Sequence, residues 1–268
     1  MAEITPAYRV SIPLEITLLG TGTSQGIPVI GCKCQVCRSP DKKNQRLRTA
    51  AFIQAGQIGL AIDIGPDFRR QMLDNQLQDV HAVLLTHEHN DHISGLDDIR
   101  PINFLYHRDI PIYGHERTIG EMHKRFYYAF DATNDYPGKP RVHSHIIDHT
   151  PFTIEGVKIN PIMIDHGVMD IFGFRIGRLA YITDAKRIPA SSKEELLDLD
   201  VLVLNALRYE THATHLNIEE AIELFHELKP KRCFLTHISH EMGLHEEVNS
   251  TLPGGMQLGY DGLTLKIN

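Results

Sequence analysis

A six-residue segment with three histidines and one aspartate constrains this chain more than any other feature. The apolar run 83–85 precedes His87-Glu88-His89-Asn90-Asp91-His92, and apolar residues at near-helical spacing follow at 93–99. This order predicts a buried strand, a tight loop and then a helix. Because a loop has no fixed side-chain period, all four side chains can turn toward one centre, where imidazole and carboxylate groups suit zinc, manganese or iron. The segment therefore predicts a metal-dependent hydrolase.

Three later apolar strands are each followed by a residue type that binds metals. These residues are His166, Asp184 and His237. Loops at strand ends often gather a site on a rigid scaffold, so we expect the three at one edge of a sheet sandwich. Taken singly, either histidine is more often a structural residue, and Asp184 could be a turn or cap residue. With the first motif they make seven candidates, which suits two metals that share a ligand and hold a hydroxide between them.

A second cluster lies in the loop at about 31–38. Cys32, Cys34 and Cys37 are three of the four cysteines, and this crowding suits a thiolate metal site better than a disulfide framework. A closed zinc site needs a fourth ligand. Cys233 is one candidate, but it falls within an apolar strand, so we favour His240. Free thiols are the alternative interpretation. A structural zinc at this position would tie the N-terminal loop to the loop after His237.

Composition limits the remaining choices. The 268 residues are 42% hydrophobic and 23% charged, and no linker divides them, so we expect one domain over residues 1–268. Hairpins are predicted at 50–62, 152–164 and 172–182. The net charge of −7 does not favour a nucleic-acid partner, although a local basic patch is left open.

The expected location follows from what the chain lacks. Met1–Thr5 shows no sign of a signal peptide, and no apolar run approaches the roughly 20 residues that cross a bilayer. We therefore expect a cytoplasmic protein that does not enter a membrane. The sequence leaves the oligomeric state open, a homodimer included.

The ordered ligand set resembles the metallo-β-lactamase-fold hydrolases over nearly the whole chain. The resemblance implies an α/β (α+β) fold, a four-layer αββα sandwich. It also implies two divalent ions, Zn or Mn, with Asp184 between them and Asp91 counted among the catalytic residues as well as the ligands. One ion would be held by His87, His89 and His166, and the other by Asp91, His92 and His237.

The cysteine loop narrows the resemblance. Together with Gly20-Thr21-Gly22, Gly26-Ile27-Pro28 and Tyr260-Asp261-Gly262, it is similar to the phosphoribosyl cyclic phosphodiesterases (PhnP type) of the carbon–phosphorus lyase pathway. That family implies hydrolysis of a small cyclic or nucleotide-like phosphodiester, with a further histidine that contacts the phosphate. His215 is the nearest match and would be a catalytic residue, with His212 as the alternative. The segment 126–141 does not match the family.

Two other functions share this ligand pattern. A tRNA 3′-processing endonuclease (tRNase Z-like) would use a basic arm to grip tRNA, and the sequence has no Gly/Pro-rich basic arm. A catalytically idle metal-binding protein is the second, although the full ligand set disfavours it. Arg46 and Arg48 could contact a phosphate, but a solvated basic face is the preferred interpretation. His215 could also be a helix-start residue without a chemical role.

Overall fold

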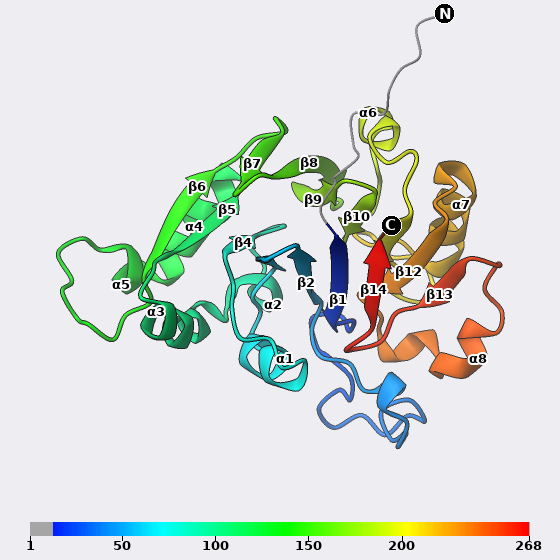
Figure 1. Ribbon diagram of the computed structural model, residues 1–268. Coiled ribbons are helices and arrows are strands. Elements are labelled where there is room, and N and C mark those ends of the chain that lie inside the picture. The colour runs from blue at the N-terminus through cyan, green and yellow to red at the C-terminus, as the bar shows by residue number, and fades with distance from the viewer. Residues whose placement is uncertain (1–12, 268) are drawn as a thin grey trace, which may run out of the picture.

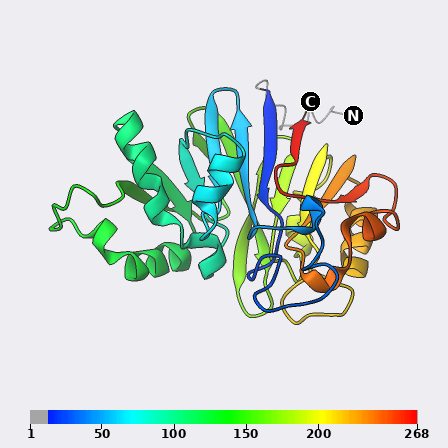
Figure 2. The ribbon, with the colours of Figure 1, turned by 90° about the horizontal axis from the view of Figure 1, so that it is seen from below.

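Two seven-stranded sheets pack face to face, and helices cover the outer face of each (Figures 1 and 2). The computed structural model describes residues 13–267, so Met1–Thr5, where we expect no signal peptide, lies outside the described residues. The architecture confirms the predicted αββα sandwich. Within the described residues, no helix is long and apolar enough to cross a membrane.

The first sheet has the order β14-β1-β2-β3-β4-β5-β6. Its strands are β1 (Leu14–Gly20), β2 (Ala50–Ala55), β3 (Ile58–Ile62), β4 (Ala82–Leu84), β5 (Ile110–Gly114), β6 (Val142–Ile146) and β14 (Thr264–Ile267). The strands from β3 to β6 pair in parallel, and the others pair antiparallel. The helices that follow these strands are η1 (Lys42–Asn44), α1 (Phe68–Asp74), α2 (Asn90–Ile93), η2 (Leu96–Ile99), α3 (Arg100–Tyr106), α4 (Glu116–Arg125) and α5 (Tyr127–Phe130).

The second sheet has the order β13-β12-β11-β10-β9-β8-β7. Its strands are β7 (Phe152–Ile154), β8 (Val157–Asp165), β9 (Asp170–Ile176), β10 (Leu179–Ile182), β11 (Val201–Asn205), β12 (Arg232–Thr236) and β13 (Met256–Leu258). The strands from β10 to β13 pair in parallel, so their carboxyl ends meet at one edge. The accompanying helices are α6 (Ala190–Glu194), α7 (Ile218–Leu228), η3 (His240–Met242) and α8 (His245–Asn249). All three predicted hairpins are present, as β2–β3, β7–β8 and β9–β10.

Strand β10 shows how the layers are held together. Leu179 and Tyr181 belong to the core between the sheets, whereas Ala180 and Ile182 belong to the core beneath α7. Successive side chains of a strand point to opposite faces, so a strand buried on both faces has a continuous apolar sequence. This burial explains why the sequence signal for the strand is a run rather than an alternation.

Arg46 corrects one expectation, because it is buried instead of forming a solvated basic face. Its side chain is 4% exposed, and Nη1 donates hydrogen bonds to Thr21 Oγ1 at 2.7 Å and to the Gly259 carbonyl at 2.6 Å. Burial and the Arg46 charge lower the pKa of His245 to about 4, so neutral His245 can accept from Arg46 Nη2 at 3.0 Å. Arg48 pairs with Asp67 at 3.0 Å. Arg46 therefore joins the N-terminal loop to the C-terminal part of the chain.

We expect Arg46→Met to lower the free energy of unfolding by about 2–5 kcal/mol. The substitution leaves the buried Gly259 carbonyl and the Thr21 hydroxyl without the guanidinium, at about 1–3 kcal/mol for each unsatisfied group. Urea unfolding followed by circular dichroism measures the change. The control is Arg70→Met, whose exposed pair with Asp74 should contribute within about 0.5 kcal/mol. Equal stability of the two variants would contradict the role of Arg46.

Candidate metal centre

The seven predicted ligands meet at one edge of the two sheets. The first four follow β4, and the other three follow β8, β10 and β12. The sequence predicts all four on a loop, but the helix α2 begins at Asn90, so Asp91 and His92 lie in its first turn. Ligand atoms of the seven residues that lie within 4.8 Å of one another form three groups: His87, His89 and His166; His87, His92 and Asp184; Asp91, His92 and His237. A fourth group joins His166 and Asp184 to His215.

The first group is a set of three imidazoles. His87 Nε2 and His89 Nδ1 are 3.0 Å apart, and the His166 ring centroid lies 5.4 Å from that of His87 and 5.3 Å from that of His89. His166 Nδ1 is 2.8 Å from the Thr214 carbonyl, which can only accept a hydrogen bond. The proton of neutral His166 therefore lies on Nδ1, which leaves Nε2 with a lone pair for a metal.

Asp184 joins the second and third groups, because it lies between the imidazoles of His92 and His237. Asp184 Oδ1 is 3.1 Å from His237 Nε2, and Asp184 Oδ2 is 3.5 Å from His92 Nε2. His92 Nε2 and both ring nitrogens of His237 are buried, and no described residue forms a hydrogen bond with them. Buried polar atoms normally have partners, and the two Nε2 atoms lie against the Asp91 and Asp184 carboxylates. A pair of divalent cations fits this donor set of imidazoles and shared carboxylates, and the clusters suggest a dinuclear metal site.

Asp63 is a buried acid beside the candidate ligands that sequence reasoning missed. Its Oδ2 lies 2.7 Å from His92 Nδ1 and accepts a hydrogen bond from Thr86 Oγ1 at 2.8 Å. Because that hydroxyl donates to Asp63, it accepts from His87 Nδ1 at 3.0 Å. Asp63 thus orients both imidazoles with Nε2 free. Its position in the sequence could have identified it, since Asp63 follows the apolar strand β3 as Asp184 follows β10.

The electrostatics of the site favour positive charge. Burial by itself would raise the pKa of Asp184, but His237 and His92 hold that pKa well below its usual value. Burial opposes protonation of His237, yet Asp184 and Asp91 raise the pKa of its imidazole to about 9. The carboxylates therefore stabilise cationic partners in a buried setting, which is the environment that a divalent ion requires.

Three of these residues have a left-handed backbone at a strand end. The φ angles are 62° for Asp63, 57° for Asp184 and 55° for His237. Non-glycine residues adopt this region at a cost, and such conformations concentrate at functional sites. The turn directs each side chain toward the site directly after its strand.

His215 lies at the pocket, and His212 lies behind it. A cavity of about 240 Å³ is lined by His215 and by several predicted ligands, together with Ser24, Val168, Met169 and Thr214. His215 Nε2 is 3.1 Å from Asp184 Oδ1, and its Nδ1 is 3.0 Å from His212 Nδ1. Burial lowers the pKa of His215 to about 4, against the opposing effect of Asp184. The ligand and catalytic roles of all these residues stay predictions.

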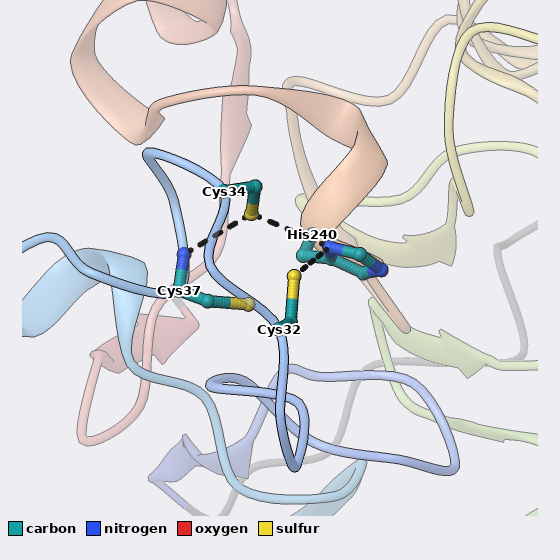
Figure 3. A group of neighbouring side chains, drawn as sticks. All are labelled: Cys32, Cys34, Cys37 and His240. Carbon is teal, nitrogen blue, oxygen red and sulfur yellow. Dashed lines mark hydrogen bonds between the residues drawn. The ribbon is translucent and has the colours of Figure 1, made fainter.

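The cysteine loop meets His240, as Figure 3 shows. The Sγ atoms of Cys32 and Cys34 are each 3.4 Å from His240 Nδ1, and Cys37 completes a group of four ligand atoms within 4.8 Å. The Cys37 amide donates to Cys34 Sγ at 3.4 Å, and this bond together with His240 lowers the pKa of Cys34 to about 6. Cys233 is instead buried in the core beneath α7. The cluster suggests a structural metal.

Comparison with known proteins identifies the family. A model described as the beta-lactamase superfamily domain matches residues 60–238. The chain belongs to the metallo-β-lactamase superfamily. A solved structure described as a new diphosphatase from the PhnP family is 39% identical, with 96% of this chain and 98% of that chain covered and a TM-score of 0.90. This match confirms the resemblance to PhnP-type proteins, and the chain has the clusters of a metal-dependent hydrolase of this fold.

Two further relatives differ in what they show. The chain is 40% identical over 254 residues to an octanoyltransferase of Porphyromonas gingivalis, which covers 93% of this chain and 51% of that protein. The chain therefore spans about half the length of this curated relative. Zinc-bound PqqB of Methylobacterium extorquens is 19% identical with a TM-score of 0.78, covering 94% of this chain and 100% of that chain, and it shows the fold alone.

We expect Cys34→Ser to remove about one bound metal ion per chain and to lower the melting temperature, because a hydroxyl is a poor replacement for a thiolate ligand. Elemental analysis of the purified variant measures the loss. Cys233→Ala is the matched control, since its thiol lies in the apolar core and should leave the metal content unchanged. The same metal content in Cys34→Ser and the parent protein would reject a metal at this cluster.

Proposed function

We propose that this chain hydrolyses a P–O bond at a phosphorus atom that carries two ester or anhydride substituents, in a small phosphodiester or diphosphate. The observation that carries the proposal is that the buried Nε2 atoms of His92 and His237 lie 3.1–3.2 Å from the Asp91 and Asp184 carboxylates, without a hydrogen bond to any described residue. The PhnP-family relative, described as a diphosphatase, supports this class of bond. Cyclic phosphodiesters and diphosphate diesters share such a disubstituted phosphorus.

The grouping of the side chains supports an assignment of the protein ligands to two cations. One ion would be held by His87, His89 and His166, the other by Asp91, His92 and His237, with Asp184 shared between them. Zinc and manganese both fit these imidazole and carboxylate donors. When bound, such ions lower the pKa of water toward about 7 and offset negative charge on phosphoryl oxygens.

The side chains around the pocket have separate tasks. Asp63 and Thr86 orient His87 and His92. His215 Nε2 lies 3.1 Å from Asp184 Oδ1 at the cavity, and it would donate a hydrogen bond to a phosphoryl or leaving-group oxygen once Asp184 holds a metal. A cavity of about 240 Å³ accommodates a phosphoryl group with a small substituent, so we expect a small-molecule substrate.

Neither tRNA processing nor octanoyl transfer gains support from a specific observation. The segment 126–141, which does not match the PhnP-type family, carries Lys139 and Arg141 against Asp131 and Asp135, so it offers no net positive charge to phosphates. Octanoyl transfer is the name of a relative about twice the length of the matched region. We do not propose either activity for this chain.

Metal-loaded protein should hydrolyse bis(p-nitrophenyl) phosphate or a diphosphate diester such as ADP-ribose. The decisive variants are His89→Ala and Asp184→Ala, which should lower kcat/KM by at least about 10³-fold, more than the loss of one hydrogen-bond donor usually costs. Assays run with manganese, zinc and nickel measure the rates. His226→Ala, on the exposed face of α7, is the control. Cleavage of tRNA without turnover of any small diester or diphosphate would reject the proposal.

A second experiment separates the two neighbouring histidines. His215→Ala should lower kcat by about 10²–10³-fold with unchanged metal content, whereas His212→Ala, one contact further from the pocket, should have a smaller effect. Steady-state kinetics and elemental analysis provide both readouts. Loss of metal from His215→Ala would instead identify His215 as a metal ligand. A larger fall in kcat for His212→Ala than for His215→Ala would identify His212 as the residue that contacts the phosphate.

A further inference from the structure

We propose that Arg117, in the first turn of α4, is a positioning residue that holds the two ligand-bearing loops of the opposite sheets in register. It touches neither the pocket nor a predicted ligand side chain. The inference rests on the metal-ligand part of the proposed function and adds a residue outside the motif. The argument begins with Glu88, which occupies a spacer position between His87 and His89.

Glu88 turns away from the candidate metal centre and toward α4. Its Oε1 accepts a hydrogen bond from Arg117 Nε at 2.5 Å, and its Oε2 accepts one from Thr118 Oγ1 at 3.2 Å. The Glu88 side chain is 9% exposed. Both partners lie in the first turn of a ten-residue helix, where the helix dipole also favours a carboxylate. The spacer side chain is therefore an anchor, because His87 and His89 flank it directly in the chain.

The same guanidinium reaches the second sheet. Arg117 Nη2 donates to the Asp170 carbonyl at 2.7 Å. Asp170 begins β9 and closes the turn after His166, whose amide donates to the Met169 carbonyl at 2.8 Å. One side chain thus contacts the His87–His92 segment and the His166 turn together. The planar guanidinium, with its several fixed donors, suits such a bridge better than the single ammonium of lysine.

The far end of α4 supports the same loop. Arg125 is the last residue of the helix, and its Nη1 donates to the Glu88 carbonyl at 2.7 Å and to Asn90 Oδ1 at 2.8 Å. The loop is therefore attached at both ends of α4. An ordinary surface ion pair contributes little to stability. The Arg117–Glu88 pair differs, because it involves a buried acid and its guanidinium contacts two loops that supply ligands. Loss of a group that hydrogen-bonds directly to a metal ligand typically weakens metal binding by about 10–100-fold, and Arg117 acts one residue further away, so we expect a loss at the lower end of that range.

The test uses Arg117→Met and the metal-free protein first. We expect faster amide hydrogen exchange in residues 87–92 and 166–170, with little change elsewhere. Arg117→Lys should keep protection at 87–92 and lose it at 166–170, because one ammonium replaces a group that spans two acceptors. Arg70→Met is the control. It breaks an exposed ion pair with Asp74 whose Nε–Oδ2 distance of 2.7 Å is similar to that of the Arg117–Glu88 pair, and it should not change the exchange rate in either segment.

Titration with manganese or zinc gives the second readout. Arg117→Met should bind metal about 10-fold more weakly than the parent protein, and Arg70→Met should bind it equally well. Parent-like exchange in both segments together with parent-like metal affinity would overturn the proposal. Faster exchange spread evenly over the whole chain would also overturn it, since that result indicates only a general contribution to stability.

A milder variant keeps the test decisive if Arg117→Met does not fold. Glu88→Gln preserves the shape of the side chain and removes its charge, so exchange should rise at 87–92 but not at 166–170. No change at 87–92 would reject the anchor. Exchange in the metal-free protein needs no substrate, so failure of the hydrolysis assays would reject the proposed function and leave this result standing.

Discussion

The face-to-face packing of the two sheets is the interaction on which the candidate site depends, because neither sheet carries a complete ligand set. The first sheet supplies the His87–His92 segment, and the second supplies His166, Asp184 and His237. The core between them contains fully buried side chains from both sheets, among them Ile16 and Tyr181. Interiors of this kind are close-packed and have low compressibility, so the inter-sheet core sets the distance between the two halves of the site.

Polar contacts refine that distance at the edge where the site lies. The amide of Phe172 in β9 donates to the Thr86 carbonyl, directly before His87, at 3.0 Å. On the other side, the His237 amide donates to Thr49 Oγ1 at 3.2 Å. Each contact joins a ligand-bearing loop of one sheet to the opposite sheet. The bridge that we propose for Arg117 would act in the same direction, from the outer helical layer.

Sequence reasoning succeeded where a local pattern or a chemical count was available. Apolar runs identified the strands, and the residue types after them identified seven side chains that the structure brings together. Structural zinc has a coordination number of four, so three thiolates require a fourth ligand. This count predicted His240 as that ligand, although it lies more than 200 positions from Cys34. No such rule predicts the burial of Arg46, because only the topology of the fold brings its acceptors Thr21 and Gly259 next to it. The spacer Glu88 was missed for the same reason, since its partners come from a later helix.

The N-terminal loop also has a structural explanation that its sequence alone did not provide. Among the described residues that line the pocket, Ser24 is its only contribution, yet the loop contacts the segment after His237 repeatedly. The cysteine cluster meets His240, Asn44 Oδ1 accepts from the His245 amide at 2.8 Å, and Lys43 pairs with Glu246 at 2.6 Å. A metal at the cysteine cluster would therefore support the segment after His237 from outside, as α4 supports the histidine segment. Since both supports come from segments distant in sequence from the ligands they hold, the geometry of the site depends on the complete fold rather than on the motif.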